Sequence, residues 1–318
     1  MNNATLSYIL SQLPSYCDEN PVLIFFTYPQ HDSLSETLHA LPIVMTAGAN
    51  LSSPSESGAT KKVAGLYDWY QEGENQDPAS IETGMRIQEH IPNAKVWVHE
   101  NRAMVNRAIR WLARNGVTQV VDLGSGKPSP HGKSTHEAVN RITPEARVLY
   151  VEIEETAVVE GKKMIDKGNW SEKVAMIHES ALNPASIMSN TEATRIIDWD
   201  KPVVLIMSAL IHFFRPEQYR PMMAFWRANL RRDSALIMTH GSFDEYDQNT
   251  LTKVLAHYER MGMEAYLRSK EELIDVMEGW ELMKPGLVRA GHWKPEAREV
   301  GEDPPSNFEF WWVAVARL

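Results

Sequence analysis

The sequence predicts an α/β protein built on a doubly wound, mainly parallel sheet. From residue 117 onward, short apolar segments typical of buried strands alternate with segments of helical periodicity. A glycine-rich turn, Asp122-Leu-Gly-Ser-Gly126, follows the first of these strands. The 318 residues are 43% hydrophobic and 23% charged, which is an ordinary globular composition with enough chain for a full core.

The region before residue 117 differs in pattern from the rest. Residues 3–13 suggest a short helix, residues 22–27 have strand composition, and the small and polar residues of 47–60 are typical of a linker. Residues 61–116 are predicted to be mostly helical, and Asn115-Gly116 ends the clearest helix, 101–114. We therefore expect an N-terminal extension over 1–60, a helical cap over 61–116 and a Rossmann-like domain over 117–318.

Within that domain the strands and helices follow in turn. The expected strands share apolar, β-branched composition and cover residues 117–123, 147–151, 174–177, 202–208 and 235–239. The expected helices between them cover residues 135–142, 156–167, 217–230 and 248–261. Ser269 and Glu272 form a capping box that opens another helix, and the alternating, aromatic-rich residues 307–317 form a last strand.

Composition excludes several classes of protein. A net charge of −10 disfavours nucleic acid as a main partner, because phosphate binding needs a clustered basic surface. We expect no membrane span and no signal peptide, since no apolar run reaches the ~18–20 residues that cross a bilayer. The single cysteine, Cys17, excludes a disulfide within the chain and favours the cytoplasm. No Cys/His cluster has zinc spacing, so we expect no metal.

The glycine-rich turn favours a nucleotide-type ligand without a phosphate. A dinucleotide site needs a third glycine where this chain has Ser129. A P-loop needs four residues between its glycines, whereas five separate Gly126 from Gly132, and two of the five are prolines without the N–H groups that cradle phosphate. S-adenosylmethionine requires neither feature.

S-adenosylmethionine needs close backbone approach at the first turn and an acid for its ribose hydroxyls. Asp122, Gly124, Ser125 and Gly126 are candidates for the first requirement. Glu152, at the end of the next strand, is the candidate for the second, because a carboxylate accepts hydrogen bonds from two hydroxyls at once. The alternative is that Glu152 is a surface acid at a strand end.

Residues 63 to 295 resemble a large bacterial family of S-adenosylmethionine-dependent methyltransferases, the methyltransferase-19 type. The matching segments, in the expected order, are Tyr67-Asp68, Asn101-Arg102, Arg107-Ala108, the turn 122–126, Tyr150-Val-Glu152, Ala209-Leu-Ile-His212-Phe213, Thr239-His240-Gly241, Arg268-Ser269 and Pro285-Gly286-Leu287-Val288. The resemblance implies a class I methyltransferase sheet with a helical N-terminal lid, an antiparallel C-terminal strand and S-adenosyl-L-methionine as cofactor. The chain departs from the family pattern at Ser180, where an acid is common, and at Glu152, where Asp is more common.

Two histidines are candidates for catalysis. His212 follows the fourth strand and His240 the fifth, so both are expected at the mouth of the cleft, where a neutral imidazole can accept a proton near pH 7. Alternatively, His212 packs against Phe213 and Phe214, and His240 bonds to local backbone.

Further candidates lie in the cap and at strand ends. An aromatic face attracts a cation, so Tyr67 is expected near the sulfonium, unless its ring belongs to the core. Arg102 is a candidate partner for the methionine carboxylate, or else it lies on an exposed helix face, and Asn101 is expected to cap that helix. Ser180 and Ser208 complete the expected cofactor-binding set.

Three functions follow from this interpretation. The first is methyl transfer to a small molecule, expected in specialised metabolism by family analogy. The second is a cyclase in which the cofactor's own α-amine attacks its γ-carbon, giving azetidine-2-carboxylate and methylthioadenosine. The third is a non-catalytic cofactor-binding protein. A homo-oligomer is left open.

Overall fold

The computed structural model describes residues 22–24, 43–45, 63–73, 77–127, 129, 133–242, 244, 246–260, 262, 264–298 and 310–318. The chain divides into two compact units, residues 1–56 and 57–318. In the first unit, strands β1 (Val22–Ile24) and β2 (Ile43–Met45) pair antiparallel, with Leu23 opposite Val44. The helix expected over 3–13 and the linker expected over 47–60 lie outside the described residues.

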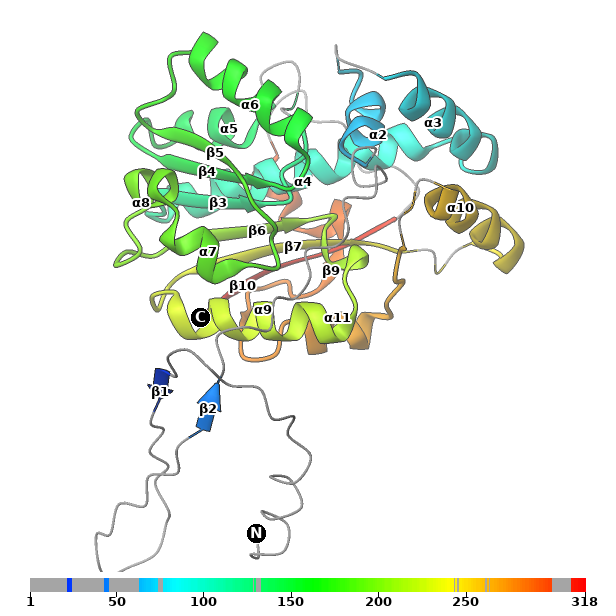
Figure 1. Ribbon diagram of the computed structural model, residues 1–318. Helices are drawn as coiled ribbons and strands as arrows, with labels where there is room; N and C mark the ends of the chain where they lie inside the picture. Colours follow the sequence, from blue (N-terminus) through cyan, green and yellow to red (C-terminus); the bar gives the residue numbers. More distant parts are fainter. Residues whose placement is uncertain are drawn as a thin grey trace, which may run out of the picture. The chain divides into compact units, whose positions relative to one another are not determined.

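An eight-stranded sheet forms the centre of the second unit (Figure 1). Its strands are β3 (Gln119–Leu123), β4 (Arg147–Glu152), β5 (Val174–His178), β6 (Val204–Ser208), β7 (Ala235–Gly241), β8 (Glu281–Leu282), β9 (Val288–Arg289) and β10 (Trp311–Arg317). The order is β5-β4-β3-β6-β7-β10-β8, with β9 also paired to β10. Strands β3 to β7 are parallel and β10 is antiparallel to β7, as the sequence predicts. The chain order reverses between β3 and β6, which is where ligands bind in such sheets.

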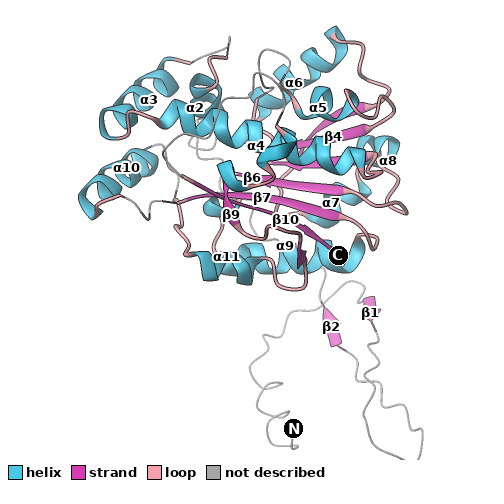
Figure 2. Ribbon diagram, turned by 180° about the vertical axis from the view of Figure 1, so that it is seen from behind, coloured by secondary structure: helices cyan, strands magenta, loops and turns pink. Residues whose placement is uncertain are grey.

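Both faces of the sheet are covered by helices, so its strands are apolar on both sides. In β7, Ala235 and Ile237 belong to one core, and Leu236 and Met238 belong to the other. The first core is closed by α4 (Ala94–Arg114), α5 (Thr135–Asn140) and α6 (Glu155–Lys167). The second is closed by α7 (Pro184–Ser189), α8 (Thr191–Ile196), α9 (Pro216–Asn229) and α11 (Lys270–Val276) (Figure 2).

Three further helices gather beyond the carboxyl ends of β6 and β7, at the right of Figure 1. These cap helices are α2 (Val63–Tyr70), α3 (Pro78–His90) and α10 (Gln248–Arg260). Asp77 caps α3 by accepting a hydrogen bond from the Ser80 amide at 2.9 Å. Helices α3 and α10 are far apart in the sequence but in contact in the fold. The rings of His90 and His257 stack with their centroids 5.8 Å apart.

The structure corrects the expected start of the helix that precedes the sheet. We predicted that it begins at Asn101, but α4 begins at Ala94. Trp97 and Val98 are buried, and this packing extends the helix by two turns. The short elements α7, α8, β8 and β9 were not anticipated, because segments of two to six residues carry little periodicity. No helix among the described residues is long and apolar enough to cross a membrane.

Candidate active site

The glycine-rich turn, residues 122–126, leaves β3 with two residues in the left-handed region. Gly124 has φ +61° and Gly126 has φ +68°, conformations that favour glycine. A Cβ on Gly124 would lie 2.6 Å from the Leu210 Cδ1 atom, whereas no atom of the described residues, apart from Gly126 and its two chain neighbours, lies within 4 Å of a Cβ position on Gly126. The amides of Gly124 and Ser125 donate to the Val151 carbonyl at 2.8 and 3.2 Å. The turn is therefore fixed to β4, with open space beside Gly126.

Glu152 ends β4 and holds the turn from the other side. Its Oε2 atom accepts from the Gly126 amide at 2.8 Å, and its Oε1 atom accepts from the amides of Ile153 and Glu154 at 2.8 and 2.9 Å. Burial raises the pKa of Glu152, although these three donors favour the ionised form. A carboxylate offers about four acceptor sites, so about one remains for a ligand hydroxyl. The alternative of a surface acid is therefore wrong, because Glu152 is buried and shapes the turn.

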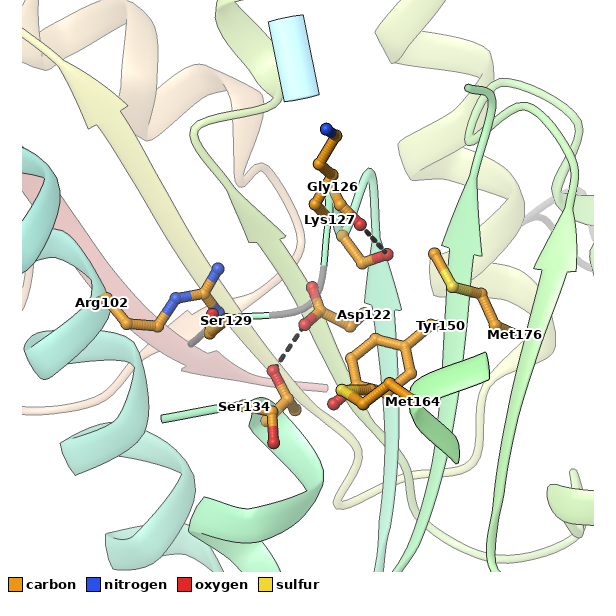
Figure 3. Close-up of a pocket in the computed structure, with 11 residues that line it drawn as sticks. Arg102, Asp122, Gly126, Lys127, Ser129, Ser134, Tyr150, Met164 and Met176 are labelled. Atoms are coloured by element: carbon orange, nitrogen blue, oxygen red, sulfur yellow. Dashed lines mark hydrogen bonds between the residues drawn. The ribbon is translucent and has the colours of Figure 1, made fainter. Parts of the chain in front are cut away.

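Arg102 and Asp122 line a small cavity under the turn (Figure 3), and Thr135 lines it as well. The Thr135 hydroxyl donates to the Asp122 carboxylate at 2.6 Å. Arg102 reaches from α4 toward Asp122 and is only 8% exposed, which excludes the alternative of an exposed helix face. Burial raises the pKa of Asp122, and Arg102 opposes that shift. A cation and an anion therefore lie together in one small, buried space.

A second group of buried charges lies where α2 approaches the turn. Burial raises the pKa of Asp68 to about 6, against the attraction of Lys127. Lys127 is mostly buried, with its Nζ atom 3.7 Å from the Glu160 Oε2 atom. Burial also raises the pKa of Glu154 to about 7, although the Thr156 hydroxyl donates to it at 2.7 Å. Lys127 thus links the turn electrostatically to α2.

Asn101 joins the cap to the sheet instead of capping a helix. It is fully buried within α4, and its Nδ2 atom donates to the Tyr67 hydroxyl at 2.7 Å and to the Ser208 Oγ atom at 3.0 Å. The Oγ atom of Ser208, the last residue of β6, lies 3.3 Å from the Oγ1 atom of Thr239 in β7. The structure therefore brings together two predicted site residues, Tyr67 and Ser208, through Asn101, whose expected capping role is wrong.

The segment after β6 carries His212 in a fixed turn. Ala209 has φ +51°, a strained conformation for a residue with a Cβ, and its amide donates to the Thr239 Oγ1 atom at 2.9 Å. His212 lies in the short helix η2 (Ile211–Phe213). Arg268 donates to the carbonyls of Ile211 and Phe214, which flank His212. The Tyr266 amide donates to the His212 carbonyl at 2.7 Å. These bonds hold the backbone of His212 from both sides.

The two candidate histidines lie together but differ in access. The ring centroids of His212 and His240 are 5.4 Å apart, with the planes nearly perpendicular. His240 is fully buried, because β7 continues through Gly241 and pairs with β10. The expectation that His240 faces the mouth of the cleft is therefore wrong. Its Nδ1 atom donates to the Gly241 carbonyl at 2.7 Å, which is the local backbone bond considered as the alternative.

Both rings are uncharged near neutral pH. Burial lowers the pKa of His212 well below its ordinary value, and His240 and Arg268 add to the shift. Burial lowers the pKa of His240 to about 4. The buried Nδ1 atom of His212 has no hydrogen-bond partner in the part of the chain that the structure describes. His212 is thus a neutral imidazole with an uncommitted nitrogen. It also packs edge-on against Phe213 at 4.2 Å, so the packing alternative holds as well.

A large cavity separates the cap helices from the carboxyl edge of the sheet. Its volume is about 110 Å³, close to that of an engineered cavity of ~150 Å³ that binds benzene. We call it the aromatic cavity, because most of its lining is apolar and much of that is aromatic, including Tyr67, Tyr70, Trp97, His212, Tyr258 and Trp311. Tyr67 and His212 therefore face the same space, which the sequence did not show.

Ser180 lines neither cavity. Its Oγ atom accepts from the Leu182 amide at 3.2 Å in the turn after β5. The neighbouring Glu179 accepts from the Ser180 amide at 2.8 Å and from Asn183 at 3.1 Å. Both side chains are used by the local turn, and the cofactor contact of Ser180 stays a prediction. The described residues contain no cluster of three or more metal-ligating side chains.

Comparison with known proteins decides the family. A family model described as S-adenosyl methyltransferase matches residues 52–318. The chain belongs to this family. A crystal structure described as a methyltransferase from Thermobifida fusca is 26% identical, covers 85% of this chain and 99% of its own, and has a TM-score of 0.72. A DUF574 family protein from Streptomyces avermitilis is 27% identical, covers 80% and 96%, and also has a TM-score of 0.72. No protein with a curated description matches.

These comparisons confirm the predicted class I methyltransferase fold and S-adenosylmethionine as the family's cofactor. The described residues fit that group. The open space beside Gly126 lets a ligand approach the backbone closely. The Arg102 guanidinium, whose buried Nε atom has no hydrogen-bond partner among these residues, and the Asp122 carboxylate match the carboxylate and ammonium of a methionine moiety.

Several supporting residues were missed by sequence reasoning. Thr135 and Thr239 are polar residues at the margin of buried elements, and Arg268 is a buried arginine outside the sheet. Thr239 carried a usable signal, since a hydroxyl at the end of an apolar strand is close to the ligand edge of a parallel sheet. Arg268 lies in a segment that matches the family, but nothing in the sequence indicated its supporting role, because its partners are carbonyls more than 50 residues earlier in the chain.

Proposed function

We propose that this chain transfers the methyl group of S-adenosylmethionine to a small molecule bound in the aromatic cavity. The observation that carries the proposal is the position of this cavity. It lies against Tyr67 and Ala209, next to Leu210, which contacts Gly124 of the glycine-rich turn. A separate space for an acceptor therefore adjoins the space for the cofactor.

The proposal gives each residue a role. The turn backbone, Glu152, Asp122 and Arg102 hold the cofactor, which supplies an electrophilic methyl group on a sulfonium. Tyr67, fixed by Asn101, presents its ring at the boundary between the two spaces. His212 receives a proton from the acceptor at an imidazole nitrogen, because it is neutral and lines the acceptor's cavity. His240 is left out of this set, since it is fully buried.

The aromatic cavity also bears on the two other functions. An enzyme that cyclises its own cofactor needs no second pocket, so a separate cavity of about 110 Å³ favours an intermolecular acceptor. A non-catalytic binding protein needs no uncommitted imidazole beside it. A place in specialised metabolism rests on the family resemblance alone.

One assay separates these functions. Purified protein is incubated with S-adenosylmethionine, with and without a panel of aromatic hydroxyl and amine acceptors, and products are identified by mass spectrometry. We expect S-adenosylhomocysteine together with a methylated acceptor, and neither product from heat-inactivated protein. Methylthioadenosine formed without any acceptor would establish the cyclase instead. Cofactor binding without turnover across the panel would favour a binding protein.

A further inference from the structure

We propose that the aromatic cavity accepts an uncharged, planar aromatic compound. This inference rests on the proposed function and names the class of its acceptor. It is carried by the chemistry of the cavity walls.

The walls disfavour a charged ligand. Among the described residues that line the cavity there is no Asp, Glu, Lys or Arg, and its histidine, His212, is neutral. A carboxylate or ammonium bound here would lose its hydration without gaining a counter-charge, which is costly. The cavity therefore favours uncharged compounds, because charged ones lose hydration there without compensation.

The walls also favour a flat ring. Trp97 and Phe310 stack face to face with ring centroids 3.9 Å apart and planes 2° apart. Trp311 meets Phe310 edge to face at 5.0 Å, and Tyr246 meets Trp97 edge to face at 5.5 Å. Aromatic rings prefer stacked or edge-to-face partners, and such pairs are more favourable than their buried area alone. A planar aromatic ligand continues this arrangement, whereas a saturated ring system of equal size does not.

Three size-matched probes test the inference: coumarin, coumarin-3-carboxylate and octahydrocoumarin. Each is titrated by calorimetry into the full chain saturated with S-adenosylhomocysteine. We expect coumarin to bind at least about tenfold more tightly than either of the others, because the anion lacks a counter-charge and the saturated bicycle cannot stack. Equal or tighter binding of the anion or of the saturated bicycle overturns the inference.

The titrations also separate this inference from the proposed function. If S-adenosylhomocysteine binds but coumarin does not, the aromatic acceptor is wrong and methyl transfer stands. If S-adenosylhomocysteine itself does not bind, the proposed function fails and the inference fails with it.

Discussion

The glycine-rich turn and the aromatic cavity share the ligand edge of the sheet but are built differently. The turn comes from one segment, residues 122–126, braced by Glu152 and lined by buried charges. The cavity is assembled from segments between Leu66 and Trp311, and its walls carry rings and aliphatic groups. We call these two regions the turn half and the cavity half. The turn half is defined by backbone geometry and charged side chains, whereas the cavity half is defined by its shape and its apolar side chains. A site for two ligands can therefore recognise one of them through charge and backbone geometry and the other through shape and apolar contacts.

Helix α2 contributes residues to both the turn half and the cavity half. Tyr67 and Tyr70 line the aromatic cavity, whereas Asp68, between them in the sequence, is buried and interacts with Lys127 beside the turn. A helix places adjacent residues on different faces, so one short helix serves both spaces. If the two halves are energetically independent, substitutions in one leave ligand affinity in the other unchanged. The following predictions test that independence.

The largest expected effect is on stability, from Arg268→Met, which removes the support of the segment around His212. The substitution leaves the carbonyls of Ile211 and Phe214 without their donor and removes the guanidinium stacked 4.8 Å above Tyr219. We expect the free energy of unfolding to fall by about 3 kcal/mol, measured by urea denaturation. Coumarin affinity is expected to fall as well, since His212 loses its backbone support.

The control for this variant is Arg220→Met, which removes an exposed arginine from α9 and is expected to leave stability unchanged. In folded Arg268→Met protein, S-adenosylhomocysteine affinity should stay within about twofold of the wild-type value. A loss of cofactor affinity equal to the loss of coumarin affinity would show that the two halves are coupled.

The next effect is on cofactor affinity, from Glu152→Ala. The substitution removes the acceptor for the Gly126 amide and the one acceptor site left for a ribose hydroxyl. We expect S-adenosylhomocysteine to bind about 100-fold more weakly by calorimetry, because hydrogen bonds to a charged group are worth ~1.5–3 kcal/mol each. The exposed Glu155→Ala serves as control. An unchanged affinity in Glu152→Ala would mean that the turn keeps its shape without this carboxylate.

A smaller effect tests α2 through Asp68→Asn. Burial raises the pKa of Asp68 from 3.8 to about 6, so the folded state holds this proton more tightly than the unfolded state. The stability linked to that proton is lost as pH rises through about 6, and at pH 8 the buried group is ionised at a cost. We expect Asp68→Asn to raise Tm at pH 8 by about 2–4 °C.

The gain from Asp68→Asn should shrink as pH falls from 8 to 5, since the wild-type carboxyl becomes neutral over that range. Asp200→Asn, an exposed position, should shift Tm at neither pH. A Tm that falls at pH 8 would instead assign the Asp68 carboxylate a stabilising ion pair with Lys127.

The smallest expected effect is that of pH on methyl transfer, for which we expect kcat/KM not to change near neutral pH. Burial, with His240 and Arg268 nearby, lowers the pKa of His212 well below its ordinary value of 6.5. A neutral His212 therefore persists as pH falls from 8 through 6.5, and kcat/KM with an acceptor from the assay panel should stay constant over this range. A rate that halves near pH 6.5 would place the proton acceptor in a water-exposed setting, not in the aromatic cavity.

Sequence reasoning predicted the residues of the glycine-rich turn well and the arrangement of residues around the aromatic cavity poorly. Asp122, Gly124 and Gly126 were predictable, because a strand followed by closely spaced glycines constrains backbone dihedrals locally. His240 was misplaced, since nothing local indicates that β7 continues through Gly241 and pairs with β10. Asn101 was misread as a cap, because the buried Trp97 that extends α4 finds its partner Phe310 more than 200 residues later.

The sequence by itself determined the alternation of strands and helices, the glycine-rich turn after β3 and the acid that ends β4. These features depend on periodicity and on backbone conformations within a few residues. Only the tertiary structure decided that Asn101 joins Tyr67 to Ser208, that Arg268 supports His212, and that cap and sheet enclose an aromatic cavity. Those features depend on contacts between residues far apart in the chain, which exist only once the two cores have packed.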